Sequence, residues 1–227
     1  MSRANRFMDM YQAMLAALGP SGWWPGDTPF EVAVGAVLTQ NTSWANVEKA
    51  MATLRAHDLL TPAAMLDISE AALAEAIRPA GYYRIKAGRL ANLLRFLRTE
   101  AEEFGHGEAD LHDPALPMLQ GRNARDLRER LLTVRGIGPE TADSILLYAL
   151  GLPVFVVDAY TARIALRHGL AFEDAGYHEL QEIFTDALPE DAALFNEYHA
   201  LLVRVGHEWC RKKEPRCRDC PLAIFLD

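Results

Sequence analysis

The stretch that decides the fold lies at residues 131–150 and reads LLTVRGIGPETADSILLYAL. An amphipathic helical pattern ends at the GIGP motif of residues 136–139, and a second helical pattern begins at once. Two glycines permit a turn tight enough to bring two helices together with backbone amides pointing outward, and Pro139 suits the first turn of the second helix. Outward N–H groups at a helix N-terminus can bind phosphate without side-chain charge. From this motif alone, an ordinary connection between two helices is the simpler interpretation.

The periodicity of the chain is helical almost throughout, which predicts an all-α protein. One helix starts at the TPFE motif, where Thr28 can cap, Pro29 suits the first turn and Glu31 completes a capping box. Only residues 154–157, VFVV, resemble a strand, and one four-residue run forms no sheet. The Gly- and Pro-containing segment 105–123 is expected to be a surface insertion. The predicted helices span about 7–18, 28–40, 44–57, 69–78, 82–104, 124–134, 140–150, 159–168, 177–187 and 191–209.

Composition and charge narrow the class of protein. The 227 residues are half hydrophobic, enough for a core, and no stretch approaches the ~20 apolar residues of a membrane helix. The N-terminus lacks an apolar signal core, so we expect a cytoplasmic protein. The net charge of −8 is uneven: residues 171–200 hold eight carboxylates and no Lys or Arg, whereas residues 204–218 hold six bases and two acids. An acidic lobe followed by a basic loop still allows binding to a polyanion.

Asp158 makes the hairpin motif specific. It follows the apolar run at 154–157 and precedes a helical pattern, so we expect it to cap that helix, and a carboxylate there can be a cap and nothing more. The combination of a hairpin, a Gly/Pro loop and an aspartate twenty residues after Gly138 resembles the endonuclease III superfamily of DNA glycosylases. Members of that superfamily carry a helix-hairpin-helix with a Gly/Pro-rich loop and an invariant aspartate. The resemblance covers nearly the whole chain and is least certain over 105–123.

The resemblance implies a base-excision enzyme that flips a damaged nucleotide and cuts its N-glycosidic bond. In the transition state the sugar resembles an oxocarbenium ion. A nearby carboxylate can stabilise its positive charge or orient the attacking water. Asp158 matches the family's aspartate. The bifunctional branch has a lysine two residues after the second hairpin glycine, where this chain has Glu140. Glu140 cannot form an imine, and is either part of the pocket or a first-turn carboxylate favoured by the helix dipole. We therefore expect a monofunctional enzyme.

Further matches concern contact with DNA. Gln40 matches the family residue that fills the gap left by the flipped base, and Tyr82 matches the intercalating wedge, although a tyrosine at a helix start can also be a packing residue. The adenine-specific branch is disfavoured because its catalytic glutamate aligns with Ala36. The predicted DNA contacts are Gln40, Asn41, Tyr82, Arg135, Gly136, Gly138 and Thr141.

Three of the four tryptophans lie near the predicted pocket, at Trp23, Trp24 and Trp44. Core packing is the ordinary role of a tryptophan. The WWPG, TPFE, GAVLTQNT and GIGPETA motifs, however, resemble the 3-methyladenine DNA glycosylase III branch, in which aromatic side chains stack on an alkylated purine and a glutamate replaces the hairpin lysine. An N-methylated purine is cationic, so stacking and cation–π attraction favour it by ~1–2 kcal/mol over a neutral base. We predict that Trp24 and Trp44 line the base pocket.

The three cysteines lie in one short segment, as Cys210-x6-Cys217-x2-Cys220, and are too few for a disulfide framework. The spacing is similar to the first three ligands of the superfamily's [4Fe–4S] loop. The fourth ligand would fall at Leu226, which cannot bind iron, but the adjacent Asp227 can donate a carboxylate. A zinc site of His207, Cys210, Cys217 and Cys220 is the alternative. We favour the iron–sulfur cluster because the family resemblance surrounds the loop.

The resemblance also implies two all-α lobes. Residues 27–150 would form a helical barrel that ends in the hairpin of 131–150, and residues 1–26 with 151–227 a second lobe carrying the cluster loop at 210–227. The expected partner is double-stranded DNA with a damaged base, bound by a monomer at the nucleoid and not at a membrane. Two other functions stay open: an endonuclease III-like oxidised-pyrimidine glycosylase with abasic-site lyase activity, and a catalytically silent module that only binds damaged DNA.

Overall fold

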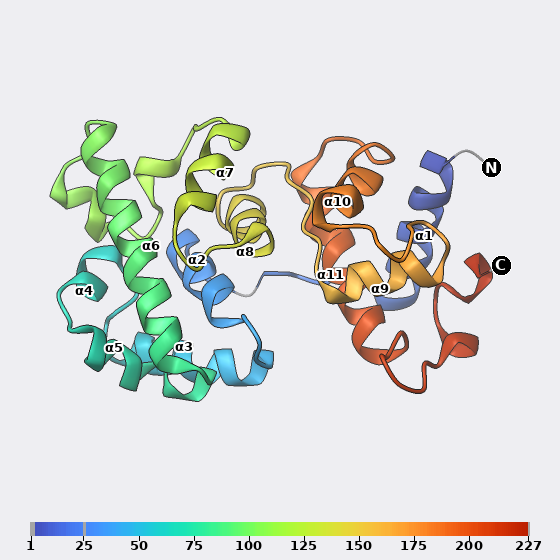
Figure 1. Cartoon of the computed structure of the whole chain (residues 1–227), viewed down its shortest axis with the longest axis horizontal. Coiled ribbons are helices and arrows are strands. Elements are labelled where there is room, and N and C mark those ends of the chain that lie inside the picture. The colour runs from blue at the N-terminus through green and yellow to red at the C-terminus, as the bar shows by residue number, and fades with distance from the viewer. Residues whose placement is uncertain (1–2, 25, 227) are drawn as a thin grey trace. The chain divides into compact units, whose positions relative to one another are not determined.

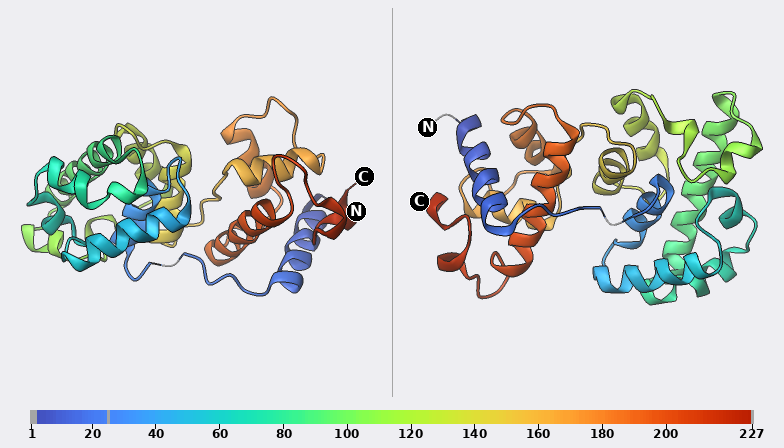
Figure 2. Two further views of the ribbon diagram at one scale, coloured as in Figure 1. Left: turned by 90° about the horizontal axis from the view of Figure 1, so that it is seen from below. Right: turned by 180° about the vertical axis from the view of Figure 1, so that it is seen from behind.

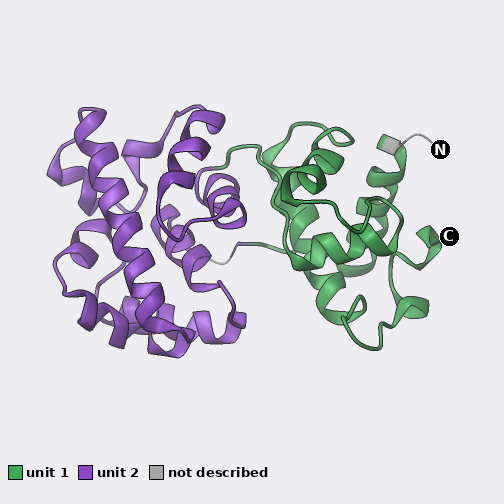
Figure 3. Ribbon diagram, viewed as in Figure 1, with its two compact units in different colours: residues 1–23, 151–227 green, residues 24–150 purple. Residues whose placement is uncertain are grey.

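The computed structural model describes residues 3–24 and 26–226, and confirms the all-α prediction, since no strand occurs among them (Figure 1). The chain divides into two compact units (Figure 3): unit 1 is Met1–Trp23 with Gly151–Asp227, and unit 2 is Trp24–Leu150. Within the described residues, no helix has the length and apolar character that a bilayer crossing demands.

Unit 2 is built around two helices of different character. Every residue of α2 (Pro29–Leu38) after Pro29 is buried, as expected for a helix that is apolar on all sides. The long helix α6 (Tyr83–Glu103), green in Figures 1 and 2, packs against α2 and the smaller helices. The remaining helices of the unit are α3 (Trp44–Ala56), α4 (Pro62–Leu66), α5 (Glu70–Ala76), α7 (Ala124–Thr133) and α8 (Pro139–Ser144), which continues as the π-helical turn Ile145–Ala149, with 3-10 turns at Arg78–Ala80, Glu108–His112 and Pro117–Leu119.

Unit 1 has an aromatic core that joins both ends of the chain. The rings of Phe155 and Phe184 stack at 4.4 Å, Phe7 meets Phe184 edge-on at 5.1 Å, and the Tyr198 hydroxyl donates to the Phe7 carbonyl at 2.9 Å. These side chains come from the N-terminal helix, from the segment after unit 2 and from the last helices, so the unit needs both chain segments. Its elements are α1 (Arg3–Leu18), α9 (Ala159–Arg167), α10 (Tyr177–Thr185), α11 (Ala192–Glu208) and the 3-10 turns Cys217–Asp219 and Ala223–Phe225.

The strand-like run at 154–157 lies in a segment without regular secondary structure, residues 151–158. Phe155 is fully buried, and its carbonyl accepts a hydrogen bond from Gln181 Nε2 at 2.6 Å. Two residues on, the Val157 N–H donates to the Tyr177 hydroxyl at 3.4 Å. Side chains of α10 thus satisfy the backbone groups that a neighbouring strand would satisfy in a sheet, so the β-branched character of the run reflects burial.

The prediction of a surface insertion at 105–123 is wrong. The segment forms two 3-10 turns and contributes buried side chains to unit 2. The Pro114 carbonyl also accepts the Phe30 N–H at the start of α2, at 2.9 Å. The Gly and Pro content indicates turns but carries no information on burial, whereas the apolar residues between the turns do. Those buried residues are Leu111, Leu116, Met118 and Leu119.

Candidate functional site

The predicted hairpin is present and is held by an ion pair between its two helices. Asn123 Oδ1 caps α7 by accepting the N–H groups of Arg125 and Asp126. Arg128 on α7 binds Asp143 on α8 through two hydrogen bonds of 2.5 and 3.1 Å, and Asp143 is fully buried. This two-point contact fixes how α7 and α8 sit against each other, and with them the loop of residues 134–138.

Gly136 is required at the turn for two independent reasons. Its φ of +98° is a backbone conformation that a residue with a Cβ rarely adopts. A Cβ at this position would also lie 2.5 Å from Cγ of Arg89, whose side chain crosses the turn. Gly138, by contrast, has an extended conformation (φ −95°) as the residue before α8. The neighbouring Arg135 is exposed on the loop.

The Gln40 side chain is hydrogen-bonded at both ends of its amide, to the hairpin through Nε2 and to α6 through Oε1. Nε2 donates to the Gly136 carbonyl at 3.1 Å and to Thr141 Oγ1 at 2.9 Å, and Oε1 accepts from Arg89 Nη1. Thr141 is therefore a buried partner of Gln40, with only 6% of its surface exposed. Asn41 follows as an exposed residue with a φ of +54°, which asparagine tolerates better than most residues. The loop that carries Gln40 is thus joined to the hairpin before any DNA binds.

Tyr82 projects from unit 2 where α6 begins. Its side chain is 68% exposed and its φ is +46°, so it is not the packing residue that the sequence left as an alternative. Ile85, one turn further, is 57% exposed. Sequence reasoning missed Ile85, whose only signal is an isoleucine between the charged residues Arg84 and Lys86. Together Tyr82 and Ile85 form an apolar tip at the start of α6.

Trp24 and Trp44 meet in an aromatic cluster with a third ring. Trp24 contacts Trp44 edge-on at 5.2 Å and Tyr148 in a tilted arrangement at 5.1 Å. The Trp44 indole N–H donates to Glu48 at 2.9 Å. Sequence reasoning missed Tyr148 because it lies in the apolar run ILLYAL, in which a tyrosine is expected to be a core residue. The two tryptophans and Glu48 line a hollow of about 190 Å³, completed by Gly26, Glu31, Gly35, Met51 and Arg55.

The wall of this hollow depends on α2. A Cβ on Gly35 would lie 3.2 Å from Trp24 Cζ2, so the glycine makes room for the indole. Glu31 closes the start of the helix, but not as the predicted capping box. Thr28 Oγ1 accepts the Glu31 N–H at 3.2 Å as expected, whereas Glu31 Oε2 accepts the N–H of Asp27, one residue earlier, at 3.0 Å. Arg55 also binds Glu31 at 3.0 Å and offsets its buried charge.

Asp158 caps α9, as the sequence predicted. Its Oδ1 accepts the Thr161 N–H at 2.7 Å and lies 3.7 Å from His199 Nε2. Burial raises the pKa of Asp158, but the nearby His199 and the hydrogen bond from the Thr161 N–H outweigh burial, and the pKa lies below its usual value. His199, which belongs to α11, was not identified from the sequence because its link to Asp158 spans forty-one residues and has no local signal. Glu140 lies exposed in the first turn of α8.

The three cysteines lie in the segment that follows α11. Cys210 is buried, and its Sγ accepts a hydrogen bond from Arg167 Nη1 at 3.2 Å, while Cys220 Sγ accepts one from the Leu222 N–H at 3.4 Å. Burial raises the pKa of the Cys220 thiol, and the nearby Cys210 and Cys217 raise it further. Asp227, the predicted fourth ligand, lies outside the described residues. Among the residues that are described, no three ligand side chains gather closely enough to hold a metal ion.

These contacts nevertheless fit the chemistry of a thiolate-bound cluster. Three soft donors lie near enough to influence one another's ionisation, and sulfur accepts hydrogen bonds from a guanidinium and a backbone N–H. Such donors stabilise the negative charge of thiolate ligands. His207, the further ligand of the zinc alternative, is exposed at the end of α11.

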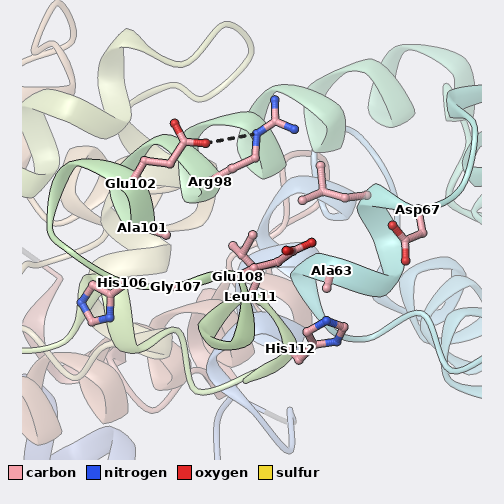
Figure 4. A pocket seen from close by; sticks show the side chains of 11 residues that line it. Ala63, Asp67, Arg98, Ala101, Glu102, His106, Gly107, Glu108, Leu111 and His112 are labelled. Carbon is pink, nitrogen blue, oxygen red and sulfur yellow. Dashed lines mark ion pairs between the residues drawn. The ribbon is translucent and has the colours of Figure 1, made fainter.

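A separate hollow lies elsewhere in unit 2, between α4, the end of α6 and the 3-10 turn at Glu108–His112 (Figure 4). Arg98 and Glu102 on its rim form an ion pair of 4.0 Å along α6. Its other polar side chains include His106 and His112. None of the site residues predicted from the sequence lines this hollow.

Sequence comparisons support the interpretation of the hairpin. The family model described as HhH-GPD superfamily base excision DNA repair protein matches residues 34–190. A putative DNA repair glycosylase of Methanocaldococcus jannaschii is 45% identical over 216 residues, which are 95% of this chain and 93% of that protein.

Solved structures give the same picture. A 3-methyladenine DNA glycosylase (MagIII) of H. pylori bound to 1,N6-ethenoadenine has a TM-score of 0.70 and 28% identity, with 92% of this chain and 98% of that chain covered. A trapped endonuclease III–DNA covalent intermediate has a TM-score of 0.79 over 100% of this chain and 96% of that chain. Its identity is only 21%, so this second likeness concerns the fold.

Proposed function

The chain belongs to the HhH-GPD superfamily of base excision DNA repair proteins and is a DNA glycosylase, and we propose that it is a monofunctional one that removes alkylated purines. The observation that carries this proposal is the carboxylate of Asp158, fixed at the start of α9 by the Thr161 N–H and lying 3.7 Å from His199 Nε2. A glycosylase needs a fixed negative charge where positive charge develops on the sugar.

The lowered pKa of Asp158 favours one of two roles for this carboxylate. A carboxylate that holds its charge strongly is a poor proton acceptor, so Asp158 acts by stabilising charge rather than as a general base. In the proposed reaction the bond between C1′ and the base nitrogen breaks, and its electron pair leaves with the base. Water adds to C1′ and loses a proton to solvent, which gives the abasic sugar. An N-alkylated purine is already cationic and leaves as a neutral base, so it needs no strong general acid.

The hollow beside Trp24 and Trp44 supports the substrate class. Aromatic faces attract a cationic purine more strongly than a neutral one, and Glu48 accepts the indole N–H of Trp44 at the same wall. The experiment that tests the proposal is an excision assay with matched duplexes that contain 3-methyladenine, oxidised pyrimidine, uracil or an abasic site. We expect excision of 3-methyladenine alone. Excision of the oxidised pyrimidine in its place would favour the endonuclease III-like alternative.

We expect no covalent product when the protein is incubated with abasic DNA and borohydride, because an imine requires an accessible amine. Glu140 occupies the position of the family's lysine. Burial, and then the charge of Arg89, lower the pKa of Lys86 to about 8, but Lys86 is 1% exposed and donates to two backbone carbonyls. It cannot reach a sugar. A Glu140→Lys variant is the matched comparison, since it restores an amine at the hairpin. A trapped adduct with the wild-type protein would contradict the monofunctional assignment.

We also propose that Cys210, Cys217 and Cys220 hold a [4Fe–4S] cluster, which when bound would brace the basic segment of residues 211–218 without taking part in the chemistry. Protein purified without oxygen should be yellow-brown and contain iron, and Cys217→Ser should lose both. His207→Ala provides the control: it leaves the iron content unchanged if the cluster is present, and lowers the zinc content if the site is the zinc alternative. A colourless preparation with stoichiometric zinc would reverse the assignment.

A further inference from the structure

One buried ammonium group connects two loops that the sequence analysis predicts to contact DNA. Lys86, in the first turns of α6, is 1% exposed, and its Nζ donates to the carbonyls of Leu38 at 2.8 Å and Ala80 at 2.7 Å. Leu38 is the last residue of α2, and Ala80 is the last residue of a 3-10 turn. Lys86 therefore binds the C-terminal end of each element, where carbonyl groups lack partners within the helix.

The two carbonyls occupy equivalent places in the chain. Leu38 lies two residues before Gln40, and Ala80 lies two residues before Tyr82. The Gln40 loop (residues 39–43) and the Tyr82 turn (residues 81–82) therefore start from backbone groups that share one donor. Their predicted roles are complementary, because Gln40 would fill the gap left by the flipped base and Tyr82 would wedge into the stack.

The same face of α6 also contacts a third loop, the hairpin loop of residues 134–138. Arg89 and Asn92 follow Lys86 at intervals of three residues, which places all three on one side of the helix. Arg89 binds the Gln40 amide and crosses Gly136, and Asn92 Nδ2 donates to the Arg135 carbonyl at 2.7 Å. The hairpin is thereby joined to the helix that carries Lys86.

We propose that Lys86 is a positioning residue that joins the Gln40 loop to the Tyr82 turn, so that the two segments enter a DNA duplex as one unit. The inference rests on the proposed function only in that DNA is the partner, and it does not depend on which base is excised. Burying an ammonium group is unfavourable unless its hydrogen bonds are satisfied, which accounts for its lowered pKa of about 8. A leucine or methionine would fill the same space without that cost, but would leave both carbonyls without this donor.

The test is a double-mutant cycle on opening of the duplex, read by the fluorescence of 2-aminopurine opposite a stable abasic-site analogue. This readout needs no excision. If the two segments act as one unit, Gln40→Ala and Tyr82→Ala each reduce the fluorescence change on binding, and the double variant is reduced little further. For independent residues, the fraction of the fluorescence change that remains in the double variant would equal the product of the fractions that remain in the two single variants. We expect the remaining fraction to be about threefold or more larger than that product. In a Lys86→Met background, the effects of Gln40→Ala and Tyr82→Ala on the fluorescence change should simply multiply, as they do for residues that act independently.

The controls separate positioning from folding and charge. Arg98→Met removes a cation from the same helix at a site that contacts neither loop, and should leave the non-additivity intact. If Lys86→Met does not fold, the cycle in the wild-type background remains decisive, because multiplicative effects there overturn the inference. So does a wild-type protein that binds the duplex without any fluorescence change. If 3-methyladenine is not excised but the non-additivity is present, the proposed substrate fails and the role of Lys86 stands.

Discussion

Asp158→Asn should reduce the single-turnover rate of base excision by about 10²–10³-fold, the usual loss when one preorganised electrostatic stabiliser of a transition state is removed. Asparagine has the same shape and caps helices as well as aspartate does, so the Thr161 N–H keeps its acceptor and α9 should remain intact. The variant lacks only the negative charge. Binding to undamaged duplex should therefore be unchanged, as measured by fluorescence anisotropy.

A second aspartate in the same unit provides the control. Asp191 caps α11 with a hydrogen bond of 2.7 Å to the Leu194 N–H, in the same way that Asp158 caps α9. Asp191→Asn should leave excision unchanged. If both variants excise the base at the wild-type rate, the charge of Asp158 has no role in the chemistry. An absence of excision by the wild-type protein, with damaged duplex bound selectively, would favour the catalytically silent module.

The lowered pKa of Asp158 also determines how activity and stability depend on pH. An unfolded aspartate has a pKa of about 3.9, so the stability that the ionised carboxylate contributes is complete above that pH and is lost as pH falls through the lower folded value. The wild-type protein should thus lose stability relative to Asp158→Asn in acid. Excision should show no titration of Asp158 between pH 5 and 8. A general base with a raised pKa would instead produce a sloping acid limb.

The parts of this molecule that could be predicted from sequence are those with local signals. The hairpin turn follows from glycines at 136 and 138 with Pro139, and the helix starts at Thr28 and Asp158 follow from their capping side chains. Contacts between distant segments had no such signal. His199 meets Asp158 because α11 packs against α9, an arrangement that the spacing of residues along either helix does not reveal.

Burial was predictable only where the periodicity was clear. The segment 105–123 contains apolar residues at irregular intervals, separated by turns, so its contribution to the core could not be distinguished from a surface loop. Lys86 is a charged residue whose burial could not be predicted. A lysine in a polar stretch of helix is expected to be exposed to solvent, and only its hydrogen bonds to the carbonyls of Leu38 and Ala80 explain why it is buried.

Trp44→Ala should weaken capture of a flipped alkylated purine by ~1–3 kcal/mol, the cost of one base–aromatic stack, or about 5- to 150-fold in binding. Trp44 is half-buried at the start of α3, and its indole N–H donates to Glu48, one turn further along the same helix, rather than to the core. The variant should therefore melt close to the wild-type temperature and bind undamaged duplex normally. Trp44→Phe keeps an aromatic face and should recover most of the affinity.

Trp24→Ala should produce the same loss of capture together with lower stability, since the Trp24 indole packs against Gly35 as well as against Trp44. Complete loss of a core tryptophan costs ~3–5 kcal/mol, and a half-buried one costs less. The comparison of the two variants separates stacking from packing, because only Trp24 should change the melting temperature appreciably. If both variants melt early and lose binding to all DNA alike, the tryptophans are core residues. The hollow would then have no role in recognising an alkylated purine, and the proposed substrate class would lose its support.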